Sequence, residues 1–301
     1  MRGSRLARLS DAKAILREHG AEVEAIPTEG PRTAGVAARA AVDAGADLVI
    51  AAGGDGTINE VAEGLIGTDV PLGILPAGTA NVLACEMRIP LSIRRAAETL
   101  FSYSAERISV GRLVTPDEDE RCFLLMAGAG LDAHIVYSLN SGLKRRMGKL
   151  AYWLAGFSQF GRTLEEFSVC ADGVEHRCSF ALIAKVRNYG GDLEIAREVT
   201  LLDDEFEVVL FHGRASWRYV GYLAAVAANR LKKMKNVTVL RAREVEMLNA
   251  PNDRVYLQVD GEFAGRLPAR VEMVPSALSL LMSPEYIAKA CGDRRTAEVR
   301  I

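Results

Sequence analysis

The sequence contains no uninterrupted apolar run long enough to cross a bilayer, which takes about 18 residues or more. It also lacks a strong excess of either charge, because its formal net charge is only −2. A chain with so little net charge is not a nucleic-acid binder as a whole, so any electrostatic partner must be met by a local patch. We therefore expect neither a membrane-spanning protein nor a nucleic-acid partner.

Paired cysteines and clustered histidines are absent as well. The five cysteines are scattered and none forms a CxxC pair, while the four histidines are isolated and show no metal-ligand spacing. An odd number of unpatterned cysteines indicates reduced thiols in a cytoplasm. The opening stretch "MRGSRLARLS" is charged but has no apolar segment of the kind found in secretory signals. These features predict a cytoplasmic location.

What the sequence does contain is a change of pattern near residue 105. Its 301 residues, 49% of them hydrophobic, are enough for two domains with real cores. Before residue 105 helical and strand patterns alternate, which favours a parallel sheet covered by helices. Helices are predicted over 5–20, 31–45 and 57–66, and strands over 21–27, 46–52 and 71–75.

After residue 105 strand patterns dominate and predict a mostly antiparallel β domain with a few helices. The stretches 121–128 and 237–248 are examples of these strands, and helices are expected over 144–160 and 216–233. The polar stretch "TPDEDER" (115–121) is typical of a solvated hairpin loop.

The first element is irregular, because the chain opens on a helix. In a doubly wound sheet a crossover helix follows a strand, and no such strand precedes residue 5. Either the fold lacks this strand, or the sequence begins inside a unit whose first strand has been lost.

The stretch "GGDGT" (53–57) is a strand-to-helix turn at the carboxyl end of a predicted parallel strand, where open α/β sheets bind ligands. Thr57 and Glu60 form a capping-box pattern that would start the helix at Thr57. Free backbone N–H groups and the positive end of the helix dipole would then face the turn, and glycines would let an anion approach closely. The acidic Asp55 indicates a metal ion or a proton transfer beside that anion.

A second loop, "ILPAGTANVLA" (74–84), again runs from strand through turn to helix. Gly78, Thr79 and Asn81 lie in its turn. Because the carboxyl ends of parallel strands meet at one edge of a sheet, the two turns should lie side by side. Together they predict a nucleotide-sized site.

"GGDGTINE" followed by "LPAGTAN" resembles the diacylglycerol kinase catalytic family, in particular its bacterial lipid kinases and their sphingosine kinase relatives. The first motif alone would also fit NAD kinases or phosphofructokinases, so the order and spacing of the further matches matter. These are "AGAGLDAHIV" (127–136), "GLKRRMGKLAYWLAG" (142–156), "NYGGDLEIA" (188–196), "LLDDEFEVV" (201–209) and "VDGEFAG" (259–265).

The resemblance implies an N-terminal α/β nucleotide-binding domain with a parallel sheet, formed by 1–106 and a returning segment from about 282 to 301. A C-terminal, mostly antiparallel β domain over 107–281 would bind the lipid substrate, with the active site in the cleft between the domains. The family opens with a strand and an Asn-Pro-x-Ser-Gly phosphate loop that this chain lacks. A late start codon or a truncation would explain the difference, and a divergent or inactive protein is the alternative.

The resemblance also implies roles for individual residues. It assigns Glu262 as the general base, with Asp55 and Asp260 as further catalytic candidates. It assigns ATP phosphates and magnesium to Thr28, Gly54, Asp55, Gly56, Thr57, Ile58, Asn59, Glu60, Gly78, Thr79 and Asn81.

"LLDDEF" matches a structural metal site of the family. The ligands there would be the side chain of Asp204 and the carbonyls of Leu201 and Phe206. An oxygen-only set suits Mg²⁺ or Ca²⁺. The sequence departs from the family at Glu205, where a glycine is usual.

These features predict an ATP- and Mg²⁺-dependent lipid kinase that phosphorylates a hydroxyl of a diacylglycerol-like, glycerophospholipid or long-chain-base substrate. The alternatives are a soluble-substrate kinase of the NAD kinase type and an inactive lipid-binding pseudokinase. Asn59-Glu60 and PAGTAN favour the lipid kinase. Whether the chain forms a homodimer stays open.

Two basic clusters favour binding to anionic lipids at the inner face of a membrane, although solvated helix ends would show the same sequence pattern. The clusters are Lys144, Arg145, Arg146 and Lys149, and then Arg230, Lys232, Lys233 and Lys235.

Overall fold

The computed structural model describes residues 2–117, 119–130, 164–189, 193–228, 230–248 and 255–298. The helix expected over 144–160, the first basic cluster and the stretch 131–156 lie outside the described residues. The chain divides into two compact units, Met1–Ile108 with Ser276–Ile301 and Ser109–Pro275. Strands β3 (Ser104–Val114) and β16 (Ala269–Met282) each run from one unit into the other.

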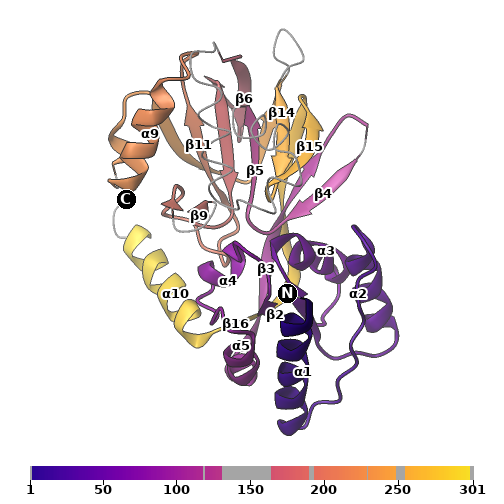
Figure 1. Cartoon of the computed structure of the whole chain (residues 1–301). Coiled ribbons are helices and arrows are strands. Elements are labelled where there is room, and N and C mark those ends of the chain that lie inside the picture. Colours follow the sequence, from indigo (N-terminus) through magenta and orange to yellow (C-terminus); the bar gives the residue numbers. More distant parts are fainter. Residues whose placement is uncertain are drawn as a thin grey trace. The chain divides into compact units, whose positions relative to one another are not determined.

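The first unit is a small parallel sheet with helices packed on it (Figure 1). Its strands β1 (Val49–Gly53) and β2 (Leu72–Pro76) pair in parallel, and β2 pairs in parallel with the end of β16, where Leu280 lies opposite Leu72. The helices are α1 (Arg2–Glu18), α2 (Thr33–Asp43), α3 (Asp55–Leu65), α4 (Val82–Glu86), α5 (Ile93–Thr99), the 3-10 helix η1 (Leu100–Ser102) and α10 (Pro284–Glu298).

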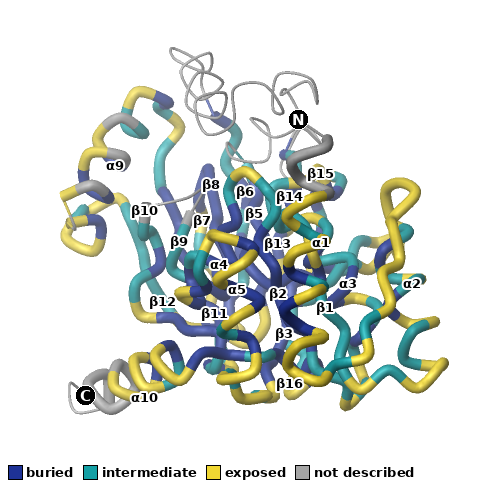
Figure 2. Tube along the Cα trace, turned by 60° about the horizontal axis from the view of Figure 1, so that its bottom comes forward, coloured by how far each residue is buried: buried dark blue, intermediate teal, exposed yellow. Residues whose placement is uncertain are grey.

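Burial in this unit follows the sequence patterns. All five residues of β2 are buried, as expected for a strand covered on both faces (Figure 2). Helix α3 buries Ile58, Val61, Ala62 and Leu65, which share one helical face, and it packs on β1 and β2. The predicted helices over 5–20, 31–45 and 57–66 and the strands over 46–52 and 71–75 are confirmed within a few residues.

The strand predicted over 21–27 is wrong, because these residues form no regular secondary structure. Short apolar alternation predicts a strand only where a neighbouring strand can take up its backbone N–H and C=O groups. Among the described residues no strand pairs with this segment, and the side chain of Ile26 is 51% exposed.

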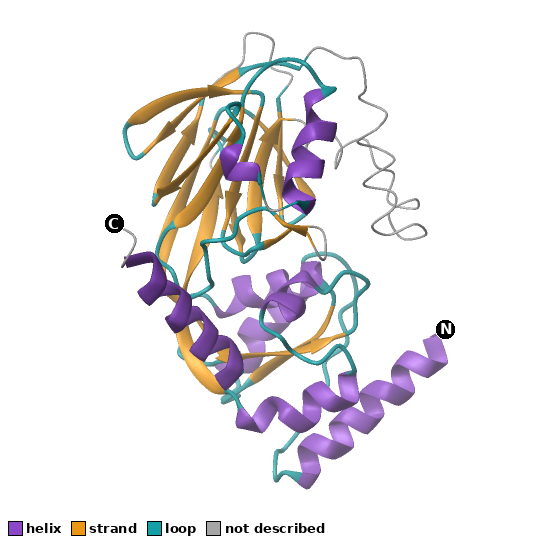
Figure 3. Cartoon of the chain, turned by 90° about the vertical axis from the view of Figure 1, so that its left-hand side faces the viewer, coloured by secondary structure: helices purple, strands orange, loops and turns teal. Residues whose placement is uncertain are grey.

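The second unit consists mainly of antiparallel strands in two large sheets (Figure 3). One sheet has the order β12-β11-β8-β5-β14-β15, and the other contains the last part of β3 and the first part of β16 together with β4, β13, β6 and β7. Strands β9 and β10 pair with each other as a small two-stranded sheet. The strands are β4 (Glu120–Phe123), β5 (Met126–Gly130), β6 (Phe167–Ala171), β7 (Val174–Cys178), β8 (Phe180–Ala184), β9 (Asn188–Tyr189), β10 (Leu193–Glu194), β11 (Phe206–Phe211), β12 (Val237–Ala242), β13 (Glu244–Met247), β14 (Tyr256–Val259) and β15 (Glu262–Arg266). Helix α9 (Arg218–Ala227) and the 3-10 helix η2 (Leu231–Lys233) accompany them.

The core of this unit is formed by apolar side chains from both sheets. Strand β11 contributes Phe206, Val208 and Leu210, and β13 contributes Val245 and Met247. The predicted combination of a parallel α/β part and an antiparallel β part is therefore confirmed.

Two stretches of this unit that were each predicted as one strand are divided. The stretches 121–128 and 237–248 each form two strands, which belong to different sheets. Alternation of apolar residues cannot show where a chain leaves one sheet for another. The helix expected over 216–233 is α9 followed by η2.

Candidate active site

The GGDGT turn connects β1 to α3. Gly54 is extended and precedes the helix, whose first residue is Asp55 rather than Thr57. The predicted capping box is therefore wrong. The Glu60 carboxylate instead accepts the backbone N–H of Ala34 at 3.1 Å, at the start of α2, so it connects two helices rather than closing its own.

The second loop follows β2 and closes on itself. The N–H of Ala77 donates to the carbonyl of Gly53 at 2.8 Å, which extends the pairing of the two strands into the loops. The side chain of Asn81 accepts the N–H of Gly78 at 2.8 Å and donates to the Gly78 carbonyl at 3.2 Å. Asn81 is buried and left-handed (φ 49°, ψ 48°), a conformation that asparagine tolerates better than most residues.

The two loops are in direct contact, as expected from the order of the strands. A Cβ atom added to Gly78 would lie 2.5 Å from the Cα of Gly54, so Gly78 leaves no room for a side chain, and a Cβ added to Gly54 would be tightly placed at 3.2 Å from the Cα of Gly78. One carboxylate oxygen of Asp55 accepts the N–H of Leu83 at 3.1 Å and connects α3 to α4. The close approach brings two stretches of glycine backbone and one half-buried carboxylate together.

The remaining residues predicted to contact the nucleotide differ in how exposed they are. Gly56 and Thr79 are exposed at the surface of their loops, and Ile58 is buried in the core face of α3. Thr28 is exposed in a segment without regular structure. Its nucleotide contact stays a prediction.

In the second unit, the turn Asp260-Gly261 joins β14 to β15. Both residues have positive φ, 47° and 77°, as a tight hairpin turn requires. The side-chain oxygen of Gln258, itself buried, accepts the N–H of Gly261 at 2.8 Å. This hydrogen bond holds the backbone of the turn, and no sequence pattern predicted it.

The Asp260 carboxylate accepts three backbone N–H groups from the link between β4 and β5 and from the first residue of β5. They belong to Leu124, Leu125 and Met126, at 3.1, 3.1 and 2.9 Å. The backbone N–H of Asp260 in turn donates to the carbonyl of Met126 at 2.9 Å. Glu262, by contrast, is exposed at the start of β15. Asp260 therefore holds the turn, while Glu262 presents an accessible carboxylate.

The turn predicted to bind a structural metal contains a cation of the protein itself. The side chain of Lys185, which is fully buried, donates from Nζ to the carbonyl of Leu201 at 3.0 Å and to that of Asp203. Asp204 accepts the hydroxyl of Ser109 at 2.5 Å. The described part of the chain contains no cluster of three or more His, Cys, Asp or Glu side chains that could hold a metal.

A buried carboxylate lies beside this turn, on β11. Glu207 is 2% exposed, and burial raises its pKa because a charged carboxylate is poorly solvated there. The backbone N–H of Glu198 donates to it at 2.6 Å and opposes that rise. Glu198 also pairs with Lys232 of the second basic cluster, at 2.5 Å.

Within the described residues, no helix is both long and apolar enough to cross a membrane.

Two protein-family models match the chain. The diacylglycerol kinase catalytic domain matches residues 2–113, and the YegS C-terminal NAD kinase beta sandwich-like domain matches residues 126–282.

Curated relatives match over most of their length. A diacylglycerol kinase of Mycobacterium tuberculosis is 29% identical over 275 residues, covering 90% of this chain and 88% of the relative. A diacylglycerol kinase of Bacillus subtilis is 28% identical over 267 residues, covering 86% of each. Among solved structures, a diacylglycerol kinase from Bacillus anthracis superposes with a TM-score of 0.72 at 18% identity, covering 94% of this chain and 92% of that one. At that identity the likeness establishes the fold.

Proposed function

Because the chain belongs to the diacylglycerol kinase family, we propose that it is an ATP- and Mg²⁺-dependent kinase that phosphorylates a hydroxyl group of a lipid. The observation that carries the proposal is the contact between Gly54 and Gly78. It leaves a cradle of glycine backbone, free of Cβ atoms, beside the Asp55 carboxylate. Backbone N–H groups in such a cradle can donate to phosphate oxygens. A carboxylate is a typical ligand of a hard cation such as Mg²⁺.

In this proposal the first unit binds the nucleotide. The backbone N–H groups of 54–57 and of Thr79 would donate to the phosphates, and Asn81, which accepts the N–H of Gly78, would hold the second loop in its binding shape. One oxygen of Asp55 accepts the N–H of Leu83, and its carboxylate charge would serve Mg²⁺. The metal, when bound, neutralises the charge that spreads over the transferred phosphoryl group.

The second unit supplies the base. A lipid hydroxyl must lose its proton as it attacks the γ-phosphate, and Glu262 would accept that proton. Its exposure supports this role, because the base must reach the hydroxyl. Asp260 is a weaker candidate, since its oxygens already accept three backbone N–H groups. We assign it to positioning Glu262.

The proposed acceptor is a diacylglycerol-like lipid, the class named for the curated relatives. A kinase that phosphorylates a membrane lipid would bind at the cytoplasmic face of the membrane. The exposed residues Arg230, Lys233 and Lys235 would be available to anionic headgroups there.

The test is a phosphorylation screen with γ-labelled ATP and Mg²⁺. Vesicles containing diacylglycerol, phosphatidylglycerol or a long-chain base are compared with NAD as a soluble acceptor, and the product is identified by mass spectrometry. We expect label in a lipid and none in NAD. Label in NAD alone would favour an NAD kinase type of enzyme, and ATP binding without any labelled product would favour a lipid-binding pseudokinase.

A further inference from the structure

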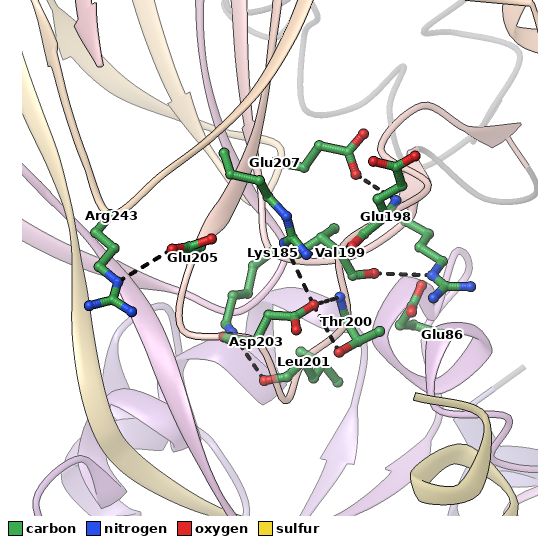
Figure 4. A network of polar contacts seen from close by, with 12 residues as sticks. Glu86, Lys185, Glu198, Val199, Thr200, Leu201, Asp203, Glu205, Glu207 and Arg243 are labelled. Atoms are coloured by element: carbon green, nitrogen blue, oxygen red, sulfur yellow. Dashed lines mark hydrogen bonds and ion pairs between the residues drawn. The ribbon is translucent and has the colours of Figure 1, made fainter. Parts of the chain in front are cut away.

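Lys185 is a lysine with no exposed surface, and it follows directly after β8. Its backbone N–H donates to the carbonyl of Leu125 at 2.8 Å, which fixes the start of the side chain. The ammonium then reaches the carbonyls of Leu201 and Asp203 (Figure 4). A buried charge is tolerated only where polar groups replace its water. This one is held by backbone oxygens of the 200–206 turn.

Convergent carbonyl oxygens are the kind of ligand that a hard metal cation takes. Here they are bound by an ammonium group, which carries one positive charge and three N–H donors. A divalent ion on the Leu201 carbonyl would sit about 2.0–2.6 Å from that oxygen. The Lys185 nitrogen is only 3.0 Å from the same oxygen, so the two cations would repel each other at close range.

The acidic residues of the turn have protein partners as well. The Asp203 carboxylate accepts the N–H and the hydroxyl of Thr200, at 2.6 and 3.0 Å, and lies 3.7 Å from the guanidinium of Arg241. The Asp204 carboxylate accepts the hydroxyl of Ser109.

The last two residues of the turn complete this arrangement. Glu205, which stands where the family has glycine, lies 3.6 Å from the guanidinium of Arg243. The side chain of Phe206 is fully buried and stacks on Phe123 with ring centroids 5.7 Å apart. The turn is therefore held in place by side chains and backbone groups of its own unit.

The described contacts do not fit the metal site that the family resemblance implies. We propose that the ammonium of Lys185 is the built-in cation of the 200–206 turn and takes the place of a divalent structural metal. This inference is independent of the proposed kinase activity. It concerns the folded state of the second unit and needs neither nucleotide nor lipid.

The test compares the thermal unfolding of the full, metal-stripped chain with and without millimolar Ca²⁺ or Mg²⁺, in the absence of nucleotide. The wild-type midpoint should stay within about 1 °C on addition of either ion, because a turn that needs no metal gains nothing from one. Lys185→Met keeps the length of the side chain but removes its charge and donors. It should lower the midpoint on the order of 10 °C, since two buried carbonyls lose charge-assisted hydrogen bonds.

Lys233→Met is the matched control, because it removes an exposed lysine of the same unit. Its midpoint should match that of the wild type. A Lys185→Met variant as stable as this control would overturn the proposal.

A second measurement remains available even if Lys185→Met does not fold. Binding of ⁴⁵Ca²⁺ to the metal-stripped wild type is measured by equilibrium dialysis and compared with Asp204→Asn. Stoichiometric binding that disappears in Asp204→Asn would place a metal in the turn and overturn the proposal. No binding, or binding that Asp204→Asn retains, would agree with the lysine as the cation of the turn.

Discussion

Replacing Gly78 by alanine should push the two glycine loops apart. The new Cβ would lie 2.5 Å from the Cα of Gly54 and 2.7 Å from the side-chain oxygen of Asn81. Carbon atoms in contact are normally about 3.5–4.0 Å apart, so relief requires a shift of roughly 1 Å. Neither neighbour can move freely, because Gly54 is backbone and Asn81 is buried with its amide bonded to Gly78.

Overpacking of this kind costs about 1–3 kcal/mol. If that cost falls on the loop conformation that binds phosphate, ATP affinity should drop by about 5- to 150-fold, since about 1.4 kcal/mol is a factor of ten. The drop would be measured by isothermal titration calorimetry with a non-hydrolysable ATP analogue and Mg²⁺. Thermal unfolding of the same samples would show whether the whole chain is also destabilised.

Gly292→Ala is the matched control. It adds the same methyl group in α10, where nothing lies within 4 Å of the new atom. Alanine in a helix should leave nucleotide affinity unchanged and stability equal or slightly higher. A Gly78→Ala chain that binds the analogue as tightly as this control would refute the assignment of the two loops to the phosphates.

Three further perturbations address other parts of the account. Asp55→Asn keeps an oxygen that accepts the Leu83 N–H but removes the negative charge. Kinase turnover should therefore fall at least about a hundredfold at unchanged melting temperature, and near-normal turnover would exclude a magnesium role for Asp55. Asp260→Ala removes the acceptor of three backbone N–H groups and should lower the free energy of unfolding by about 3–5 kcal/mol in urea titration; wild-type stability would contradict the positioning role. Burial raises the pKa of Glu207 above its ordinary value of 4.5, so the folded state keeps this proton at pH values where the unfolded chain loses it. The stability that the protonated Glu207 contributes is complete below pH 4.5 and is lost as the pH rises through the folded pKa. Glu207→Gln, which stays neutral, should therefore gain stability relative to the wild type as the pH rises above about 4.5, and a difference independent of pH would show that the pKa of Glu207 is not raised in the folded chain.

The parts of the site that local sequence could predict are those set by neighbouring residues. The apolar face of α3, with Ile58 and Leu65, follows from helical periodicity, and the two glycine loops follow from strands that end beside them. Parallel pairing of β1 and β2 then brings Gly54 to Gly78 without any further information. The strand expected over 21–27 shows the limit of the same reasoning, because alternation says nothing about whether a partner strand is present.

The contacts that sequence could not predict join residues far apart in the chain through backbone atoms. Glu60 looked like half of a capping box, but its partner is the N–H of Ala34, 26 positions away. Asp260 looked like a catalytic candidate, yet it accepts N–H groups some 135 positions earlier. Lys185 carried no signal at all, because the carbonyls that receive its ammonium belong to the backbone and leave no mark in the sequence.

The most direct test of the proposed kinase is the rate at which label passes from γ-labelled ATP to diacylglycerol in vesicles, for the wild type and for Glu262→Gln. Glutamine keeps the size of the side chain but cannot take a proton. The wild type should form labelled lipid, and kcat in the variant should fall by about 10²–10⁴-fold with ATP affinity unchanged. Absence of labelled lipid with the wild type, or equal rates for the two proteins, would contradict the assignment of lipid phosphorylation with Glu262 as its base.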